Sequence, residues 1–289
     1  MNDPSAIPPP PAPSESDAAP TAMGEAKAGA NGNGHAAGRS FLGKLRYEAH
    51  YWRRCLRISS AFLRRRFIHC NLQVTYRCNF KCRICDFWKT PHEQSEELTL
   101  DEIRILGRKL SSLGTLIVSL GGGEPLLRTD LYKITETLAE SGHFPILITN
   151  GWHVDEAVAK DILRAGLQEI SVSVDYADPA RHDAMRGMPG SWDRAVRALD
   201  LLRKHRPDKR CRVHMISVLM EDNIDDVEPL LKLSRELGVT YFLNLYSHGR
   251  GAKDERAPGP NVKVQDRLLA LKAKYPEFVS LTSYLGRFD

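Results

Sequence analysis

The sequence lacks any apolar run long enough to cross a bilayer, and its N-terminal residues contain no hydrophobic stretch of the secretory-signal type. The cysteines do not have the spacing of a disulfide framework, because three of the six are scattered, at Cys55, Cys70 and Cys211. These absences disfavour membrane-spanning and secreted proteins. We expect a cytoplasmic protein with reduced thiols.

Signatures of phosphate binding are missing as well. The three glycines at 121–123 are followed by Glu and Pro, whereas a phosphate loop needs Lys-Ser/Thr. Nor do they have the Gly-x-Gly-x-x-Gly spacing of a dinucleotide site. A nucleotide phosphate is therefore not the expected ligand of this segment.

The composition is that of a globular protein, with 289 residues, 42% of them hydrophobic and 27% charged. This length is sufficient for one large α/β domain. The net charge of +5 is uneven, because residues 41–70 contain eight Lys and Arg but a single Glu. The basic character therefore belongs to one segment, and the remainder is near neutral.

Three segments follow from these shifts in composition. Residues 1–39 are rich in Pro, Ala, Gly, Ser and Asn, which predicts a disordered tail. Residues 40–69 read as a basic helical extension, and residues 70–289 form the core domain. For 41–67 one alternative is a basic amphipathic helix that lies on an anionic membrane or on an acidic partner. We prefer a helix packed on the domain, because its apolar positions do not form one clean stripe.

The core domain alternates strand-like runs with helix-like stretches, and Thr99 with Glu102 forms a capping box where the first helix begins. Such alternation predicts an α/β fold with a parallel sheet, either wrapped like a barrel or doubly wound. In both forms ligands bind at the carboxyl ends of the strands. The predicted strands are 71–75, 115–120, 145–149, 169–174, 212–218 and 240–245; the predicted helices are 100–113, 130–140, 154–164, 192–205, 224–237 and 262–274.

Three thiols follow the first predicted strand within eight residues, as Cys78-x3-Cys82-x2-Cys85. Thiolates are soft ligands for zinc and for iron–sulfur iron. The next cysteine downstream is Cys211, so no fourth thiol is close in the sequence. This pattern predicts a metal centre with one coordination position left open.

Other polar residues follow the neighbouring strands. The segment Gly121-Gly-Gly-Glu-Pro125 allows close approach of a ligand, and the carboxylate of Glu124 suits an ammonium group. Ser173 and Asp175 are two residues apart, so they share one face of a strand and could bind ligand. Asn150 follows the third strand. The local alternatives are an Asn-Gly turn at 150–151 and a capping role for Asp175.

The cysteine motif, followed by Gly122-Gly-Glu-Pro125 one β/α unit later, resembles the radical S-adenosylmethionine (radical SAM) enzymes. The resemblance covers about residues 71–245. It implies a partial (β/α)6 TIM-like barrel with parallel strands, and so decides between the two sheet forms. Within this family, the sequence is similar to the branch that often carries a C-terminal auxiliary-cluster (SPASM-type) domain. With no cysteine after Cys211, we expect a core-only enzyme or, by a slight preference, a sequence that stops before such a domain.

The resemblance assigns roles to individual residues. It implies that Cys78, Cys82 and Cys85 hold a [4Fe–4S] cluster and that S-adenosylmethionine occupies the open position. Gly122, Gly123 and Glu124 would hold its amino group. Ser173 matches a hydroxyl that contacts the cofactor in the family, and Asp175 continues a Ser-x-Asp pattern. Asn150 remains a candidate for cofactor binding.

Two details follow the same resemblance. Residues 182–187 are similar to a loop in which an arginine is common. The residue before the third cysteine is usually aromatic and lies near the adenine, but here it is Ile84. Phe87 or Trp88 could take the place of the aromatic residue, or the adenine could rest on an aliphatic side chain. The sequence therefore does not decide which residue contacts the adenine.

The activity that the resemblance implies is reductive cleavage of S-adenosylmethionine and removal of hydrogen from a peptide, protein or small metabolite. An external flavodoxin- or ferredoxin-like protein would supply the electron. No side chain is assigned a catalytic role, because the cofactors carry the chemistry.

Two other functions remain as alternatives. The first is a non-catalytic iron–sulfur or zinc-binding module, against which an ammonium-binding Gly-Gly-Glu-Pro segment argues. The second is an RNA-modifying radical enzyme that uses the basic segment as an arm. Nucleic acid is not the expected partner, because the basic residues do not continue into the domain.

Overall fold

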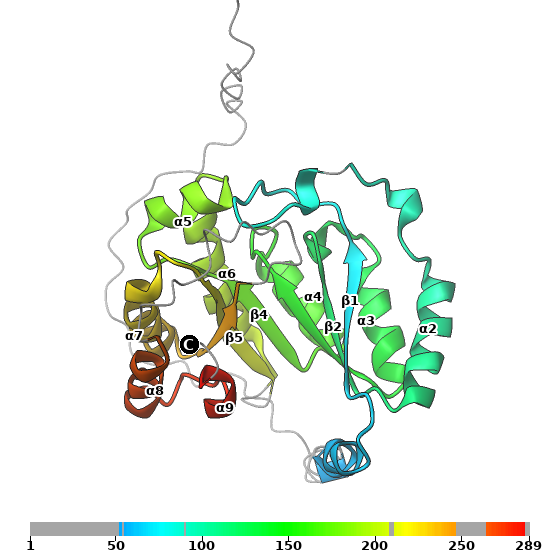
Figure 1. Ribbon diagram of the computed structural model, residues 1–289. Coiled ribbons are helices and arrows are strands. Elements are labelled where there is room, and N and C mark those ends of the chain that lie inside the picture. Colours follow the sequence, from blue (N-terminus) through cyan, green and yellow to red (C-terminus); the bar gives the residue numbers. More distant parts are fainter. Residues whose placement is uncertain (1–51, 54, 90, 208–210, 247–263, 287–289) are drawn as a thin grey trace, which may run out of the picture. The chain divides into compact units, whose positions relative to one another are not determined.

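The computed structural model describes residues 52–53, 55–89, 91–207, 211–246 and 264–286 (Figure 1). The expected tail 1–39, the beginning of the basic extension and the first two residues of the last predicted helix lie outside the described residues. None of the helices in the described ranges combines the length and the apolar character needed to cross a membrane.

Six parallel strands form one sheet, and their order in the sheet is their order in the chain, β1-β2-β3-β4-β5-β6. A doubly wound sheet needs a point where the strand order reverses, and this sheet has none. The prediction of a barrel-like wrap is therefore confirmed. The strands are β1 (His69–Thr75), β2 (Ile117–Gly122), β3 (Phe144–Thr149), β4 (Glu169–Ser173), β5 (Arg212–Leu219) and β6 (Thr240–Leu245).

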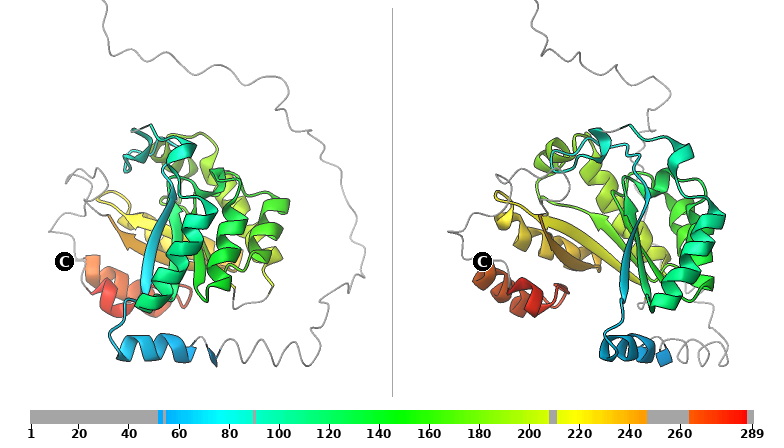
Figure 2. Two further views of the ribbon diagram at one scale, coloured as in Figure 1. Left: turned by 90° about the vertical axis from the view of Figure 1, so that its right-hand side faces the viewer. Right: turned by 45° about the vertical axis from the view of Figure 1, so that its right-hand side comes forward.

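Helices follow the strands and cover the outer face of the sheet, as two directions of view show (Figures 1 and 2). The capping box of the first helix is present, because the Thr99 hydroxyl accepts from the Glu102 backbone and the Glu102 carboxylate accepts from the Thr99 backbone. The helices are α2 (Leu100–Leu113), α3 (Leu131–Glu140), α4 (Glu156–Arg164), α5 (Pro179–Arg186), α6 (Ser191–His205), α7 (Val227–Leu237), α8 (Val264–Lys274) and α9 (Thr282–Leu285).

The structure corrects two predicted elements. Helix α5 occupies a segment that the sequence analysis took for a loop; Asp178 caps it and Pro179 stands in its first turn. The second strand was predicted to end at residue 120, but Gly121 and Gly122 still pair with β1. Two glycines in a row weaken the strand pattern in the sequence, although here they continue it.

The two faces of the sheet differ in polarity. On β4 the side chains of Ile170 and Val172 are buried in the core that the sheet forms with the helices. The residues that alternate with them, Glu169, Ser171 and Ser173, face the interior of the barrel and line its cavity. A barrel interior that is only structural is filled with bulky apolar side chains. The polar interior here indicates space for a ligand.

Residues 55–63 of the basic extension are helical. Ile58 and Ala61 contact Leu116 and Phe144 at the beginnings of β2 and β3. The guanidinium group of Arg57 donates to the carbonyl of Gly142 at 3.0 Å. This is the packed arrangement that the sequence analysis preferred for the segment.

The sheet is not closed into a full barrel, since no pairing joins β1 and β6 in the part of the chain that the structure describes. The outer edge of β6 is instead covered by a short parallel bridge between Tyr241 and Phe278. The backbone of Tyr241 donates to Glu277 and accepts from Val279, at 2.8 and 2.9 Å. The C-terminal described segment thus protects one edge strand.

Candidate functional site

A cavity of about 560 Å³ occupies the barrel interior and its carboxyl-terminal mouth. It is lined by residues of all six strands and of the cysteine loop. Every site residue predicted from the sequence lines this one cavity. They are Cys78, Cys82, Cys85, Gly122, Gly123, Glu124, Asn150, Ser173 and Asp175.

The glycine segment lies directly against the start of the cysteine loop. Gly123 donates to the carbonyl of Thr75 at 2.8 Å, and Glu124 donates to the carbonyl of Arg77 at 2.9 Å. A Cβ atom on Gly122 would stand 2.1 Å from the Thr75 oxygen, and one on Gly123 would stand 2.1 Å from the Arg77 oxygen. These two glycines are therefore required by the neighbouring backbone, whereas the sequence analysis explained them by a ligand.

The carboxylate of Glu124 is buried at this junction and accepts three hydrogen bonds. Its donors are the backbone of Leu126, the hydroxyl of Thr149 and the backbone of Asn150, at 3.1, 2.7 and 2.8 Å. Burial raises the pKa of Glu124, and the hydrogen bonds oppose that rise. Each carboxylate oxygen can accept more than one hydrogen bond. A cationic group in the cavity would therefore find a fixed, partly desolvated partner here.

Asn150 lines the cavity, but its amide is used by the protein. The amide nitrogen donates to Asn79 in the cysteine loop at 2.9 Å, and the amide oxygen accepts from the backbone of Trp152 at 2.9 Å. The Asn150 side chain thus connects the end of β3 to the cysteine loop. The turn role that was the local alternative in the sequence is present as well.

Asp175 forms a buried ion pair with Arg186 of α5 and also accepts from the backbone of Val218 at 2.9 Å. Burial raises the pKa of the nearby Cys82, and the positive charge of Arg186 opposes that rise. Asp175 therefore holds a guanidinium group beside one of the three thiols. Arg186 is the arginine that the resemblance led us to expect in residues 182–187, but the sequence analysis gave it no role in the site.

The three thiols are free and face the same cavity. Burial, together with the charges of Glu124, Cys82 and Cys85, raises the pKa of Cys78 to about 11. A bound cation reverses this effect, because it stabilises the thiolate form. Within the described ranges, no group of three or more His, Cys, Asp or Glu side chains is arranged to hold a metal ion. In an iron–sulfur cluster each protein ligand binds a different iron, so the ligands need not converge on a single point. Three thiols around one cavity therefore fit such a cluster.

The aromatic residues that could replace the missing aromatic side chain lie at the same cavity. Ile84 lines it and packs on the apolar cluster that includes Met185 and Tyr246. Phe87 and Trp88 line it as well, and the indole of Trp88 donates to the carbonyl of Cys82 at 3.1 Å. An adenine could therefore find both aliphatic and aromatic contacts here.

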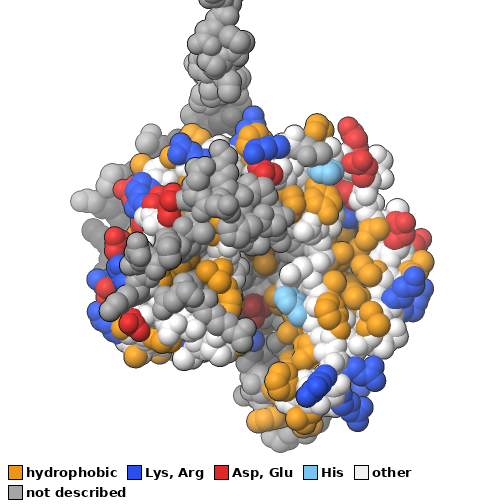
Figure 3. Space-filling model, viewed as in Figure 1, with side chains coloured by type: hydrophobic (Ala, Val, Ile, Leu, Met, Phe, Trp, Pro, Cys, Tyr) orange, Lys and Arg blue, Asp and Glu red, His pale blue; other side chains and the backbone are white. Residues whose placement is uncertain are grey.

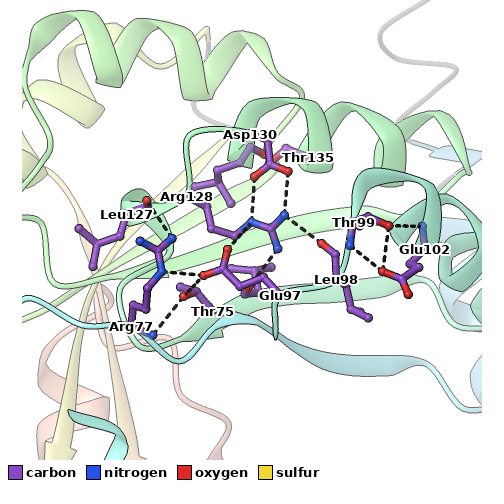
Figure 4. Close-up of polar contacts among 12 residues, drawn as sticks. Thr75, Arg77, Glu97, Leu98, Thr99, Glu102, Leu127, Arg128, Asp130 and Thr135 are labelled. Atoms are coloured by element: carbon purple, nitrogen blue, oxygen red, sulfur yellow. Dashed lines mark hydrogen bonds and ion pairs between the residues drawn. The ribbon is translucent and has the colours of Figure 1, made fainter. Parts of the chain in front are cut away.

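A buried charge network supports the cysteine loop from behind (Figure 4). The Glu97 carboxylate accepts from Arg77, the residue before Cys78, at 2.8 Å, and stands 3.5 Å from Arg128. Arg128 also donates to the carbonyl of Val74 on β1 at 2.9 Å. The network therefore fixes the point where the chain leaves β1 and enters the loop. The sequence analysis missed it.

Deeper in the barrel the cavity has a polar lining on three strands. Asn71 and Gln73 come from β1, Ser119 comes from β2, and Glu169 and Ser171 come from β4. Side chains of β3 and β5 that line the same cavity, such as Ile146 and Ile216, are apolar. The interior therefore offers both polar and apolar side chains to a bound molecule.

Comparison with known proteins agrees with this geometry. A sequence model of the radical SAM superfamily matches residues 72–234, which is more than half of the chain. An AdoMet-dependent heme synthase of Methanosarcina barkeri is 32% identical over 189 residues, covering 64% of this chain and 53% of that protein. A probable GTP 3′,8-cyclase of Pyrobaculum aerophilum is 32% identical over 181 residues, covering 62% of this chain and 58% of that protein.

Among solved structures, Streptococcus suis SuiB bound to its precursor peptide SuiA has the same fold, with a TM-score of 0.60 at 14% identity. The match covers 85% of this chain and 54% of SuiB. The chain thus spans about half the length of the relatives that it matches.

Removal of the Glu97 carboxylate takes the acidic partner from Arg77 and one of two acidic partners from the buried Arg128, which keeps Asp130 at 2.7 Å. We expect Glu97→Ala to lower the free energy of unfolding by about 1.5–3 kcal/mol, because hydrogen bonds between charged groups are lost. Glu136→Ala is the control, because that side chain is exposed on α3, and its effect should stay within about 0.5 kcal/mol. Urea unfolding followed by circular dichroism measures both, and equal effects would contradict a structural role of the network.

His182 predicts a pH dependence of stability. It is buried and accepts from the backbone of Asp175 through Nδ1 at 3.2 Å. Burial, and then Arg186, lower its pKa from 6.5 to about 4. The unfolded chain therefore binds more protons between these values, and stability should fall by about 2 kcal/mol from pH 7 to pH 5. Urea midpoints should show this loss in the native protein and much less of it in His182→Gln; an unchanged slope would contradict the assignment.

Proposed function

The chain belongs to the radical SAM superfamily, and on that basis we propose that Cys78, Cys82 and Cys85 hold a [4Fe–4S] cluster with S-adenosylmethionine beside it. Members of this superfamily use these two cofactors. We propose that the protein removes a hydrogen atom from a substrate in the barrel interior. When bound, the two cofactors supply the one-electron reductive cleavage of S-adenosylmethionine on which that step depends.

One observation supports this proposal above the others. The two motifs line a single cavity, and their backbones are joined by the hydrogen bonds from Gly123 and Glu124 to the start of the cysteine loop. A zinc-binding scaffold or an electron carrier has no need of a buried carboxylate beside its thiols. An enzyme that binds an amino acid-like cofactor does.

In this proposal, different residues of the cavity bind different groups of S-adenosylmethionine. Glu124 and the backbone of Gly122 and Gly123 receive the amino group of S-adenosylmethionine, because a buried carboxylate favours an ammonium ion. Ser173 is the last residue of β4, Asp175 lies two residues beyond it, and both line the cavity. The Arg186 charge beside Cys82 favours its thiolate form and offers a partner to a carboxylate.

For the substrate we propose a small polar molecule rather than a long peptide. The polar side chains of Asn71, Gln73 and Ser171 support this, because they line the cavity and can form hydrogen bonds with a polar molecule. Ser119, which is bonded to His69, and Glu169, which is paired with Arg212 and His214, add to the polar lining. A heme synthase and a GTP cyclase among the relatives are named for small molecules, although SuiB binds a peptide. An external electron donor, flavodoxin- or ferredoxin-like, completes the proposed reaction.

Anaerobic reconstitution with iron and sulfide tests the cofactor proposal. We expect the full chain to bind one [4Fe–4S] cluster, seen by its absorption and paramagnetic resonance spectra, and to release 5′-deoxyadenosine when a reductant is added. Cys82→Ala should lose both signals. Cys70→Ala is the matched control, because this thiol lies on β1 outside the loop, and it should keep both. Zinc without cofactor cleavage would overturn the proposal.

The Glu124→Gln variant distinguishes binding of S-adenosylmethionine from binding of the cluster. This variant should keep the cluster, because the three thiols remain, but lose about ten- to a hundredfold in affinity for S-adenosylmethionine with the buried charge. Equilibrium binding to the reconstituted protein measures the affinity. Unchanged affinity would show that the amino group is held elsewhere.

The substrate proposal predicts which part of a cell extract stimulates the enzyme. The low-molecular-mass fraction should raise the rate of 5′-deoxyadenosine release, and the macromolecular fraction should not. Ser119→Ala and Ser171→Ala, which remove hydrogen-bonding groups deep in the interior, should weaken the stimulation and leave cluster content unchanged. Stimulation by the macromolecular fraction alone would favour a peptide or protein substrate.

A further inference from the structure

The helix at residues 55–63 has two apolar faces. Ile58 and Ala61 face the domain, where they pack on the beginnings of β2 and β3. Trp52, Leu56 and Leu63 are 62%, 70% and 81% exposed. Their spacing of four and seven residues places them in one stripe on the side of the helix that faces away from the domain. The two faces together explain why the sequence shows no single clean stripe.

Two further apolar side chains are exposed near the C-terminal end of the helix. Phe62 lies beside the stripe, about 100° round the helix from Leu63, and Phe67 follows the helix. Monomeric proteins rarely leave so many large apolar side chains together on the surface. The outward face of this helix therefore has the composition of a docking surface.

Basic side chains border this stripe. Arg53 and Arg64 are eleven residues apart, so they lie on one flank of the helix, and Arg65 and Arg66 follow at its end. All four are exposed. The sequence contains no Asp or Glu between Glu48 and Asp86. Figure 3 shows hydrophobic and basic side chains side by side at the lower end of the molecule, where this helix lies.

We infer that the outward face of residues 52–67 docks on the surface of an anionic phospholipid bilayer. The combination of Trp, Phe and Leu with arginines at their border is typical of helices that lie in the membrane interface. The apolar stripe would enter the boundary between head groups and acyl chains, and the arginines would meet the negative head groups. An anionic bilayer meets both features over one continuous surface, since it offers an apolar layer to the stripe and negative charge to the arginines at its border.

The position of the helix sets the orientation of the docked protein. The helix contacts the amino-terminal ends of β2 and β3 (Figure 2). The three thiols and Glu124, which line the cofactor cavity, follow the carboxyl-terminal ends of β1 and β2. Strands of six residues separate these ends by about 20 Å. The mouth of the cavity would therefore face the water phase, and a soluble substrate or electron donor could reach it.

Vesicle co-sedimentation of the purified full chain tests the inference. We expect binding to vesicles of equal parts phosphatidylcholine and phosphatidylglycerol, and little binding to phosphatidylcholine alone. Binding should weaken as the salt concentration rises from about 0.05 to about 0.5 M, because the arginine contribution is screened. Binding that is equal on neutral and anionic vesicles, or absent from both, would overturn the inference.

Variants separate the apolar and the basic contributions. Leu56→Glu with Leu63→Glu should lower vesicle binding roughly tenfold or more, because two charges replace the apolar stripe. Arg53→Gln and Arg64→Gln should each lower it about fivefold. Leu281→Glu is the control, since this leucine is 68% exposed but lies outside the helix, and it should bind like the native protein.

The same variants exclude a folding artefact and a competing occupant. All substituted side chains are exposed, so circular dichroism and thermal unfolding should be unchanged. Light scattering shows whether the face joins two copies of the chain. A dimer that Leu63→Glu dissociates, in a protein that does not bind vesicles, would overturn the inference in favour of self-association.

Discussion

Two backbone hydrogen bonds, from Gly123 to Thr75 and from Glu124 to Arg77, hold the glycine segment against the start of the cysteine loop. They form only because no side chain stands between the two backbones, since a Cβ at Gly122 or Gly123 would overlap a carbonyl oxygen. Through them the thiols of the loop and the buried carboxylate of Glu124 share one cavity. The geometry of the whole site depends on this contact between two loops that leave neighbouring strands.

Two buried arginines support this contact from opposite sides. Arg128, paired with Glu97 and bonded to Val74, fixes the chain where it leaves β1. Arg186, paired with Asp175, brings a positive charge to Cys82 on the other side of the loop. A buried ion pair contributes little net stability, but the loss of one partner is costly. The cysteine loop is therefore positioned by charges that cannot be removed singly without penalty.

Local patterns in the sequence predicted the alternating strands and helices and the residues that line the cavity, whereas the choice of a barrel over a doubly wound sheet came from the resemblance to the radical SAM enzymes. Cys78, Cys82 and Cys85 are close in the chain, and Ser173 and Asp175 follow from the two-residue period of a strand. The pairs formed by Glu97 and by Arg186 were not predictable, because nothing in the sequence near one partner identifies the other. Likewise, Trp52, Leu56 and Leu63 were obscured by Ile58 and Ala61, since a helix with two apolar faces has no single hydrophobic stripe.

The absence of pairing between β1 and β6 in the described residues has a mechanical consequence. The radius of a closed barrel is fixed by its strand number and stagger, so it can change only if ladder hydrogen bonds break. In the described part of this chain the sheet ends at both strands, and the bridge to Phe278 protects the β6 edge without closing the ring. The sheet can therefore bend at its open side and alter the width of the interior while every strand keeps its partners. A sheet that can bend in this way can enclose molecules of different sizes.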